Sequence, residues 1–182
     1  MTKRLQNLKK PPQISEYHRT QGESIWDVCQ KFIDTGYVLH GSPSKIELLE
    51  PRPVEDASKG FGTDTAVFAV RSPASAIFSA IIDRRVLPEN ADRRVKMYHI
   101  REIDDYGNER VETYYAISKA LKNARAIKGG WVHVLPKDTF IDDPGSSECK
   151  SYQPVRPKVV IPVKPEDFPF EMHILPEEKP KK

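Results

Sequence analysis

Apolar residues in this chain of 182 residues form short groups, and one group near the N-terminus has a clear helical period. Intervals of three and four residues predict an amphipathic helix between Ser24, a suitable N-cap, and Gly36, a suitable stop. Its apolar face comprises Ile25, Val28, Cys29, Phe32 and Ile33. A second helix is predicted to begin at Pro73 and a short third over 118–126.

Most of the remaining apolar residues form runs that are typical of strands. Such runs occur at 37–39, 65–70, 95–100, 109–117 and 131–136, and prolines interrupt those of the last third. The turn sequence DDYGN separates the runs 95–100 and 109–117, which predicts a hairpin. The predicted fold class is therefore α+β, with mostly antiparallel short strands and two or three helices.

The distribution of charge suggests one domain with charged ends. We expect residues 1–14 to be a disordered basic tail, 15–175 a single domain, and 176–182 a flexible charged tail. The net charge is +3, but the ends contribute +5, so the body carries about −2. A body of that charge does not support a nucleic-acid platform of the usual basic kind.

The sequence also argues against a membrane segment or a metal site. No apolar run approaches the roughly 20 residues that span a bilayer, and no apolar core follows the basic N-terminus. We therefore expect a cytoplasmic protein without membrane contact. Cys29, Cys149 and the five histidines lack the spacing of metal ligands, so no metal is expected. Phosphate-loop and dinucleotide-binding glycine motifs are also absent from the sequence.

Three separated segments carry the residues most suggestive of function. His40-Gly41-Ser42 follows a strand, VFAVRSPASAIF (67–78) is a strand followed by a helix, and Glu148 opens a late strand. In this order they resemble the poly(ADP-ribose) polymerase-like branch of the ADP-ribosyltransferase superfamily, over roughly residues 37–163. The resemblance implies two apposed antiparallel β-sheets, split around a cleft that holds NAD as the substrate.

The resemblance assigns a role to each part of the first segment. His40 is implied to hydrogen-bond the adenosine ribose of NAD. Gly41 is implied to pair through its backbone with the nicotinamide carboxamide, a close approach that a residue without Cβ allows. Ser42 belongs to the same binding edge.

In the later segments, the resemblance implies that Phe68 forms a wall of the site. Ser75 is implied to bond the carboxamide and Phe78 to stack on the nicotinamide ring. Glu148 lies where the family carboxylate contacts the ribose beside the scissile bond. His40 and Glu148 are thus the expected catalytic residues. Such a carboxylate stabilises an oxocarbenium-like transition state, as in glycoside cleavage, and no metal is required.

The sequence departs from the family pattern at two positions. Val67 or Phe68 stands where the family has a tyrosine, and Val70 stands where it has an aspartate. The expected function is transfer of ADP-ribose from NAD to an unidentified protein, nucleic-acid or small-molecule acceptor. A non-catalytic domain that binds NAD, ADP-ribose or a protein, and an RNA 2′-phosphotransferase-like activity, remain alternatives. Glu166 and Glu171 are alternative carboxylates.

Overall fold

The structure is a computed structural model that describes residues 14–53, 64–103 and 106–177. Helix α1 (Ile25–Asp34) begins after Ser24, whose hydroxyl accepts a hydrogen bond from the Asp27 N–H, as an N-cap does. Helix α2 (Pro73–Ala80) begins at the predicted proline and is capped by Ser72. Both predicted starts are confirmed. The third helix, α3 (Lys119–Asn123), is shorter than predicted and is followed by Arg125 at a positive φ of 53°.

Among the described residues, the larger sheet has seven strands in the order β1-β9-β6-β2-β3-β8-β7. The bounds of its strands are β1 (Ser15–Glu16), β2 (Tyr37–Ser42), β3 (Val67–Val70), β6 (Gly130–Pro136), β7 (Ile141–Asp142), β8 (Glu148–Ser151) and β9 (Val159–Val163). Neighbouring strands are antiparallel except β1, which runs parallel to β9. This sheet carries the strand of each of the three segments that suggest function, whereas the rest of the second segment forms α2.

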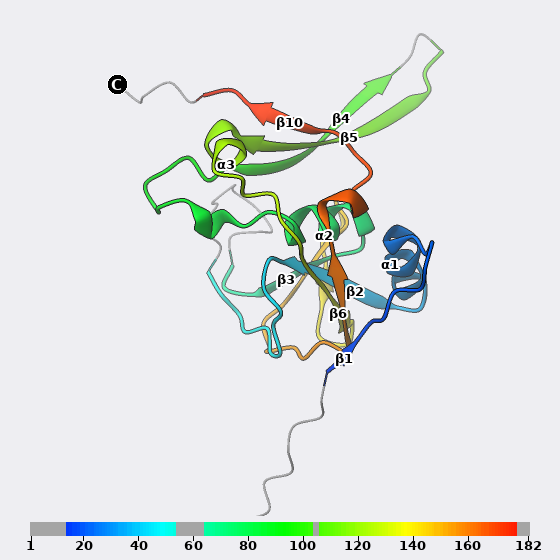
Figure 1. Ribbon diagram of the computed structural model, residues 1–182. Helices are drawn as coiled ribbons and strands as arrows, with labels where there is room; N and C mark the ends of the chain where they lie inside the picture. The colour runs from blue at the N-terminus through cyan, green and yellow to red at the C-terminus, as the bar shows by residue number, and fades with distance from the viewer. Residues whose placement is uncertain (1–13, 54–63, 104–105, 178–182) are drawn as a thin grey trace, which may run out of the picture.

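The smaller sheet has the order β10-β5-β4. Its long strands β4 (Val95–Ile103) and β5 (Glu109–Ser118) form the predicted hairpin, and β10 (Met172–Leu175) lies parallel to β5. Figure 1 shows α2 between the two sheets. Short 3₁₀ turns at Arg84–Val86 and Pro165–Asp167 lead into β4 and β10. The structure therefore confirms the α+β class.

The core joins the two sheets through α2. Phe78 of α2 is fully buried and lies against Tyr115 of β5 and Phe168, with ring centroids 5.0 and 5.4 Å apart. A second apolar cluster covers the opposite face of the larger sheet and includes Val38, Ala69 and Cys149. Each face of this sheet is thus buried against its own set of residues, which fixes the register of its strands.

The prediction for strand 37–39 was too short, because β2 continues through His40, Gly41 and Ser42. The pairing of β2 with β6 extends as far as Ser42, which lies opposite Trp131. Gly41 is tolerated within the strand because α2 approaches it too closely for a side chain. The expected N-terminal tail lies outside the described residues except for Ile14, as does the end of the C-terminal tail after Glu177. No helix in the part of the chain that the structure describes is long and apolar enough to cross a membrane.

Candidate functional site

Strands β2, β3 and β8 bring the three segments side by side. Leu39, which precedes His40, is paired with Val70 of β3, and Val70 is paired with Glu148 of β8. At a strand spacing of about 4.8 Å, the backbone of Glu148 lies about 10 Å from that of Leu39. Residues that are about 110 positions apart in the sequence thus meet at one place in the sheet.

Strand register places the side chains of His40 and Glu148 on opposite faces of the sheet. Paired residues share a face, so Glu148 lies on the face of Leu39 and Val70. His40 is one residue along from Leu39 and therefore lies on the other face. The structure does not bring the two expected catalytic side chains to one face.

The sheet changes its pairing at His40. Among the described residues, β2 and β3 are paired at Leu39 and Val70 alone. In contrast, β2 and β6 are paired from Tyr37 to Ser42. Next to the pair of Leu39 and Val70, Nδ1 of His40 lies 2.7 Å from the carbonyl oxygen of Phe68. The imidazole ring therefore bridges β2 and β3 where their backbone pairing ends.

The bond to Phe68 fixes the tautomer of His40. A carbonyl oxygen can only accept a hydrogen bond, so Nδ1 carries the proton and Nε2 of the neutral ring is an acceptor. Burial lowers the pKa of His40, which favours this neutral form. The half-buried ring can accept a hydrogen bond from a ligand hydroxyl through Nε2.

His133 on β6 supports His40 and was not predicted as a site residue. Its Nδ1 lies 3.1 Å from the His40 carbonyl, and its Nε2 accepts a hydrogen bond of 2.9 Å from the Ile46 N–H. Burial, together with the neighbouring His40, lowers the pKa of His133 to about 4. The sequence signal was a single polar residue within the apolar strand WVHVLP.

These contacts make stability depend on the protonation of His133. We expect the free energy of unfolding to fall by about 3 kcal/mol as the pH falls from 6.5 to 4, because only the unfolded chain then takes up a proton at this residue. Above pH 6.5 the residue is neutral in both states and has no such effect. Urea unfolding from pH 7 to 4 measures this change. His133→Gln keeps a hydrogen-bond donor and an acceptor but does not titrate, so the fall in the free energy of unfolding between pH 6.5 and 4 should be smaller by about 3 kcal/mol. The same fall in the variant as in the wild type would contradict this role of His133.

Ser75 and Phe78, the residues assigned to nicotinamide, are both in contact with Tyr115 of the hairpin. Burial raises the pKa of Tyr115, and the neighbouring Ser75 and Ser72 hydroxyls oppose this rise. Phe78 is completely enclosed, so it offers no free ring face for stacking. Phe78 lies in the core because α2 packs against Tyr115 of β5. The spacing of residues in the sequence could not predict this contact.

Gly41 lies tightly against α2. A Cβ atom at Gly41 would stand 2.0 Å from the carbonyl oxygen of Ala76 and 2.8 Å from the N–H nitrogen of Ala80. The glycine is therefore required for the close approach of a helix, whereas the resemblance attributes it to the approach of a ligand. Ser42 is buried, and its hydroxyl accepts a hydrogen bond from the Ser44 N–H, which orders the chain after β2.

Phe68 and Glu148 share one face of the sheet. Phe68 is paired with Lys150, two residues after Glu148, and its ring is only partly buried. Lys150 is held by Asp64, whose carboxylate also accepts a hydrogen bond from the Tyr152 hydroxyl. Glu148 is exposed at the beginning of β8, and its N–H is bonded to the Ser146 hydroxyl. This face therefore presents an aromatic ring and a carboxylate on adjacent strands.

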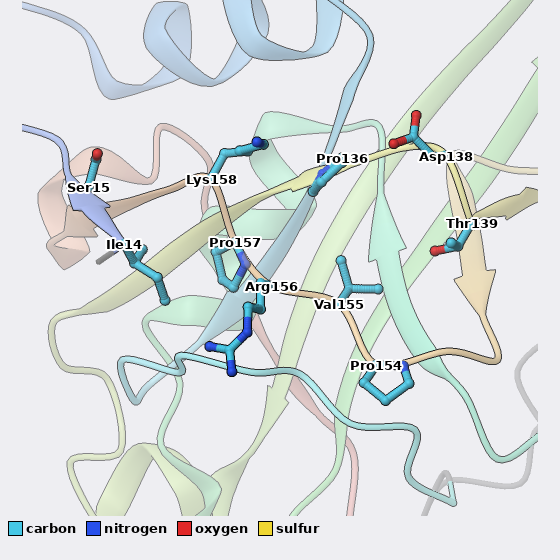
Figure 2. A pocket seen from close by; sticks show the side chains of 10 residues that line it. All are labelled: Ile14, Ser15, Pro136, Asp138, Thr139, Pro154, Val155, Arg156, Pro157 and Lys158. Carbon is cyan, nitrogen blue, oxygen red and sulfur yellow. The ribbon is translucent and has the colours of Figure 1, made fainter. Parts of the chain in front are cut away.

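Two hollows contain neither His40 nor Glu148, although the alternative carboxylate Glu171 lines the second. The first, of about 510 Å³, lies between the start of β1 and the segments 136–139 and 154–158. Figure 2 shows that its two cations, Arg156 and Lys158, point in different directions. The second, of about 600 Å³, lies beside Ser72, Trp26 and Tyr115. Within the described ranges, no group of three or more metal-ligating side chains was found.

Comparisons with known proteins give no match: no family model, no characterised protein and no solved structure is significantly similar to this chain.

Proposed function

We propose that the protein binds NAD where β2, β3 and β8 lie together and transfers its ADP-ribose to an acceptor. The observation that carries the proposal is the pairing of Leu39 with Val70 and of Val70 with Glu148, which aligns all three segments of the family resemblance. Because His40 and Glu148 lie on opposite faces of the sheet, the proposal requires NAD to reach both faces beside the pair of Leu39 and Val70.

The proposed chemistry uses one carboxylate and no metal. The bond between C1′ of the ribose and the nicotinamide nitrogen breaks, and neutral nicotinamide leaves with the bonding electrons. Glu148 stabilises the positive charge that develops on the ribose. A hydroxyl or amine of the acceptor, or water, then bonds to C1′ and loses its proton. Phe68, on the face of Glu148, supplies the aromatic contact to nicotinamide in place of the enclosed Phe78.

His40 is proposed to bind the nucleotide through Nε2, the acceptor atom that its bond to Phe68 leaves available. We expect His40→Asn to raise KM for NAD about tenfold with little change in kcat, the effect of one lost hydrogen bond. The measurement is release of nicotinamide from NAD labelled in the nicotinamide ring. His173→Asn, on β10, is the matched control and should leave KM unchanged.

The same assay separates transfer from binding alone. If labelled NAD binds and the label is retained, the protein is a binding domain and the proposed transfer is wrong. If NAD neither binds nor is consumed, the site assignment itself fails.

A further inference from the structure

The hollow of about 600 Å³ lies between α1, the start of α2, strand β5 and the segment that leads into β10. We term it the aromatic hollow, because the rings of Trp26, Tyr114, Tyr115 and Phe170 belong to its lining. None of the residues proposed to bind NAD lines it. Its volume lies within the range of sites that bind small molecules, so the chemistry of its walls indicates the class of ligand.

Two rings form an accessible corner in the aromatic hollow. The planes of Trp26 and Phe170 meet at 62°, with ring centroids 5.7 Å apart, so the rings are walls at an angle and not a parallel stack. Phe170 is stacked on the buried ring of Tyr115, with centroids 5.5 Å apart, which fixes its orientation. Phe170 is nevertheless 45% exposed, and Trp26 is partly exposed. The corner therefore offers aromatic surface to a ligand.

The charged groups of the aromatic hollow leave one carboxylate unpaired. Nη2 of Arg110 lies 2.5 Å from Oε1 of Glu112, and the Tyr114 hydroxyl donates a hydrogen bond of 2.6 Å to the same carboxylate. Glu171 is exposed, and its carboxylate forms no ion pair or hydrogen bond with any residue that the structure describes. With His173 neutral, one arginine and two glutamates give the lining a net charge of −1.

Aromatic walls beside an unpaired carboxylate favour an organic cation. The faces of aromatic rings attract cations, and tryptophan does so most strongly. A quaternary ammonium has no N–H groups, so it loses no hydrogen bonds when it leaves water for such a corner, whereas a primary ammonium is strongly hydrated. An anion would meet the charge of Glu171 and would compete with Glu112 for Arg110.

We propose that the aromatic hollow binds a small organic cation that carries a quaternary ammonium group, as choline does. The ammonium group lies in the corner of Trp26 and Phe170, and the carboxylate of Glu171 balances its charge. This site is separate from the place where β2, β3 and β8 lie together, so the inference does not depend on the proposed transfer of ADP-ribose.

Titration calorimetry of the full chain with two ligands of the same shape tests the role of charge. The first is choline, and the second is its uncharged analogue, in which a carbon atom replaces the nitrogen. Choline should bind at about millimolar concentrations, and the analogue should bind at least about tenfold more weakly. Equal affinity for both ligands would make the hollow a merely apolar site and would overturn the proposal, as would a protein that does not bind choline.

Two variants test whether choline binds in this hollow. Trp26→Leu removes an aromatic wall and should weaken choline binding about tenfold. Glu171→Gln removes the unpaired charge and should weaken it about threefold to tenfold. Trp131→Leu and Glu166→Gln are the matched controls and should leave the affinity unchanged, because neither residue lines the hollow. Trp131 already has a cation of its own, since Nζ of Lys45 lies 5.1 Å from its ring centroid.

Circular dichroism shows whether each variant is folded. Glu171 is exposed, so Glu171→Gln decides the question if Trp26→Leu does not fold. Unchanged choline affinity in the folded variants places the binding elsewhere and overturns the proposal. A peptide with trimethyllysine that binds where choline does not would indicate a protein partner, which contradicts a small-molecule site. NAD cleavage does not enter these measurements, so failure of cation binding is distinguishable from failure of the proposed function.

Discussion

Replacing Glu148 with glutamine is expected to lower the rate of nicotinamide release from NAD at least about a hundredfold, the usual scale for loss of one electrostatic contact to a transition state. Glutamine has nearly the same shape but no negative charge to stabilise the developing oxocarbenium ion. Glu148 is exposed at the beginning of β8, so the substitution should leave the fold unchanged. The loss should therefore appear in kcat, with KM altered little.

Glu166 and Glu171 provide matched controls for this variant. Both are exposed carboxylates, and both lie in the segment between β9 and β10, away from the β2–β3–β8 pairing. Glu166→Gln and Glu171→Gln should keep the activity of the wild type. An active Glu148→Gln enzyme, or an inactive Glu171→Gln enzyme, contradicts the assignment of the carboxylate.

Replacing Gly41 with alanine is expected to reduce the free energy of unfolding by more than about 3 kcal/mol, a large effect for one methyl group. The added Cβ meets the Ala76 carbonyl oxygen at 2.0 Å, and this oxygen belongs to the backbone of α2. Relief therefore requires moving the whole helix, which is packed against Tyr115 through Phe78. Urea unfolding measures the difference in the free energy of unfolding. In thermal unfolding we expect Tm to fall by about 10 °C.

Gly145→Ala is the control for Gly41→Ala. A Cβ at Gly145 has its nearest neighbour at 3.9 Å, and its φ is not positive. This variant should unfold within about 0.5 kcal/mol of the wild type. A Gly41→Ala protein as stable as Gly145→Ala would show that α2 does not approach β2 as closely as the structure has it.

Local patterns were sufficient to predict both long helices and the hairpin. The starts at Ser24 and Pro73 depend on capping and on the fixed φ of proline, which act within one turn of helix. The hairpin depends on a turn sequence between two apolar strands. These elements were predicted because their causes lie within a few residues.

Features that depend on distant residues could not be predicted. Glycine disfavours strands, yet β2 continues through Gly41 because β6, about 90 residues later, pairs with it. Phe78 fits the spacing of a nicotinamide platform, but Tyr115 and Phe168 from other parts of the chain enclose it. The faces of His40 and Glu148 follow from registers between three separated strands, which the sequence does not encode locally.

The central claim is tested most directly by incubating the wild-type protein with NAD labelled in the nicotinamide ring and measuring free nicotinamide over time. The proposed function requires steady release of labelled nicotinamide, with ADP-ribose recovered on an acceptor or as the free sugar nucleotide. NAD that remains intact in the presence of excess protein would contradict it.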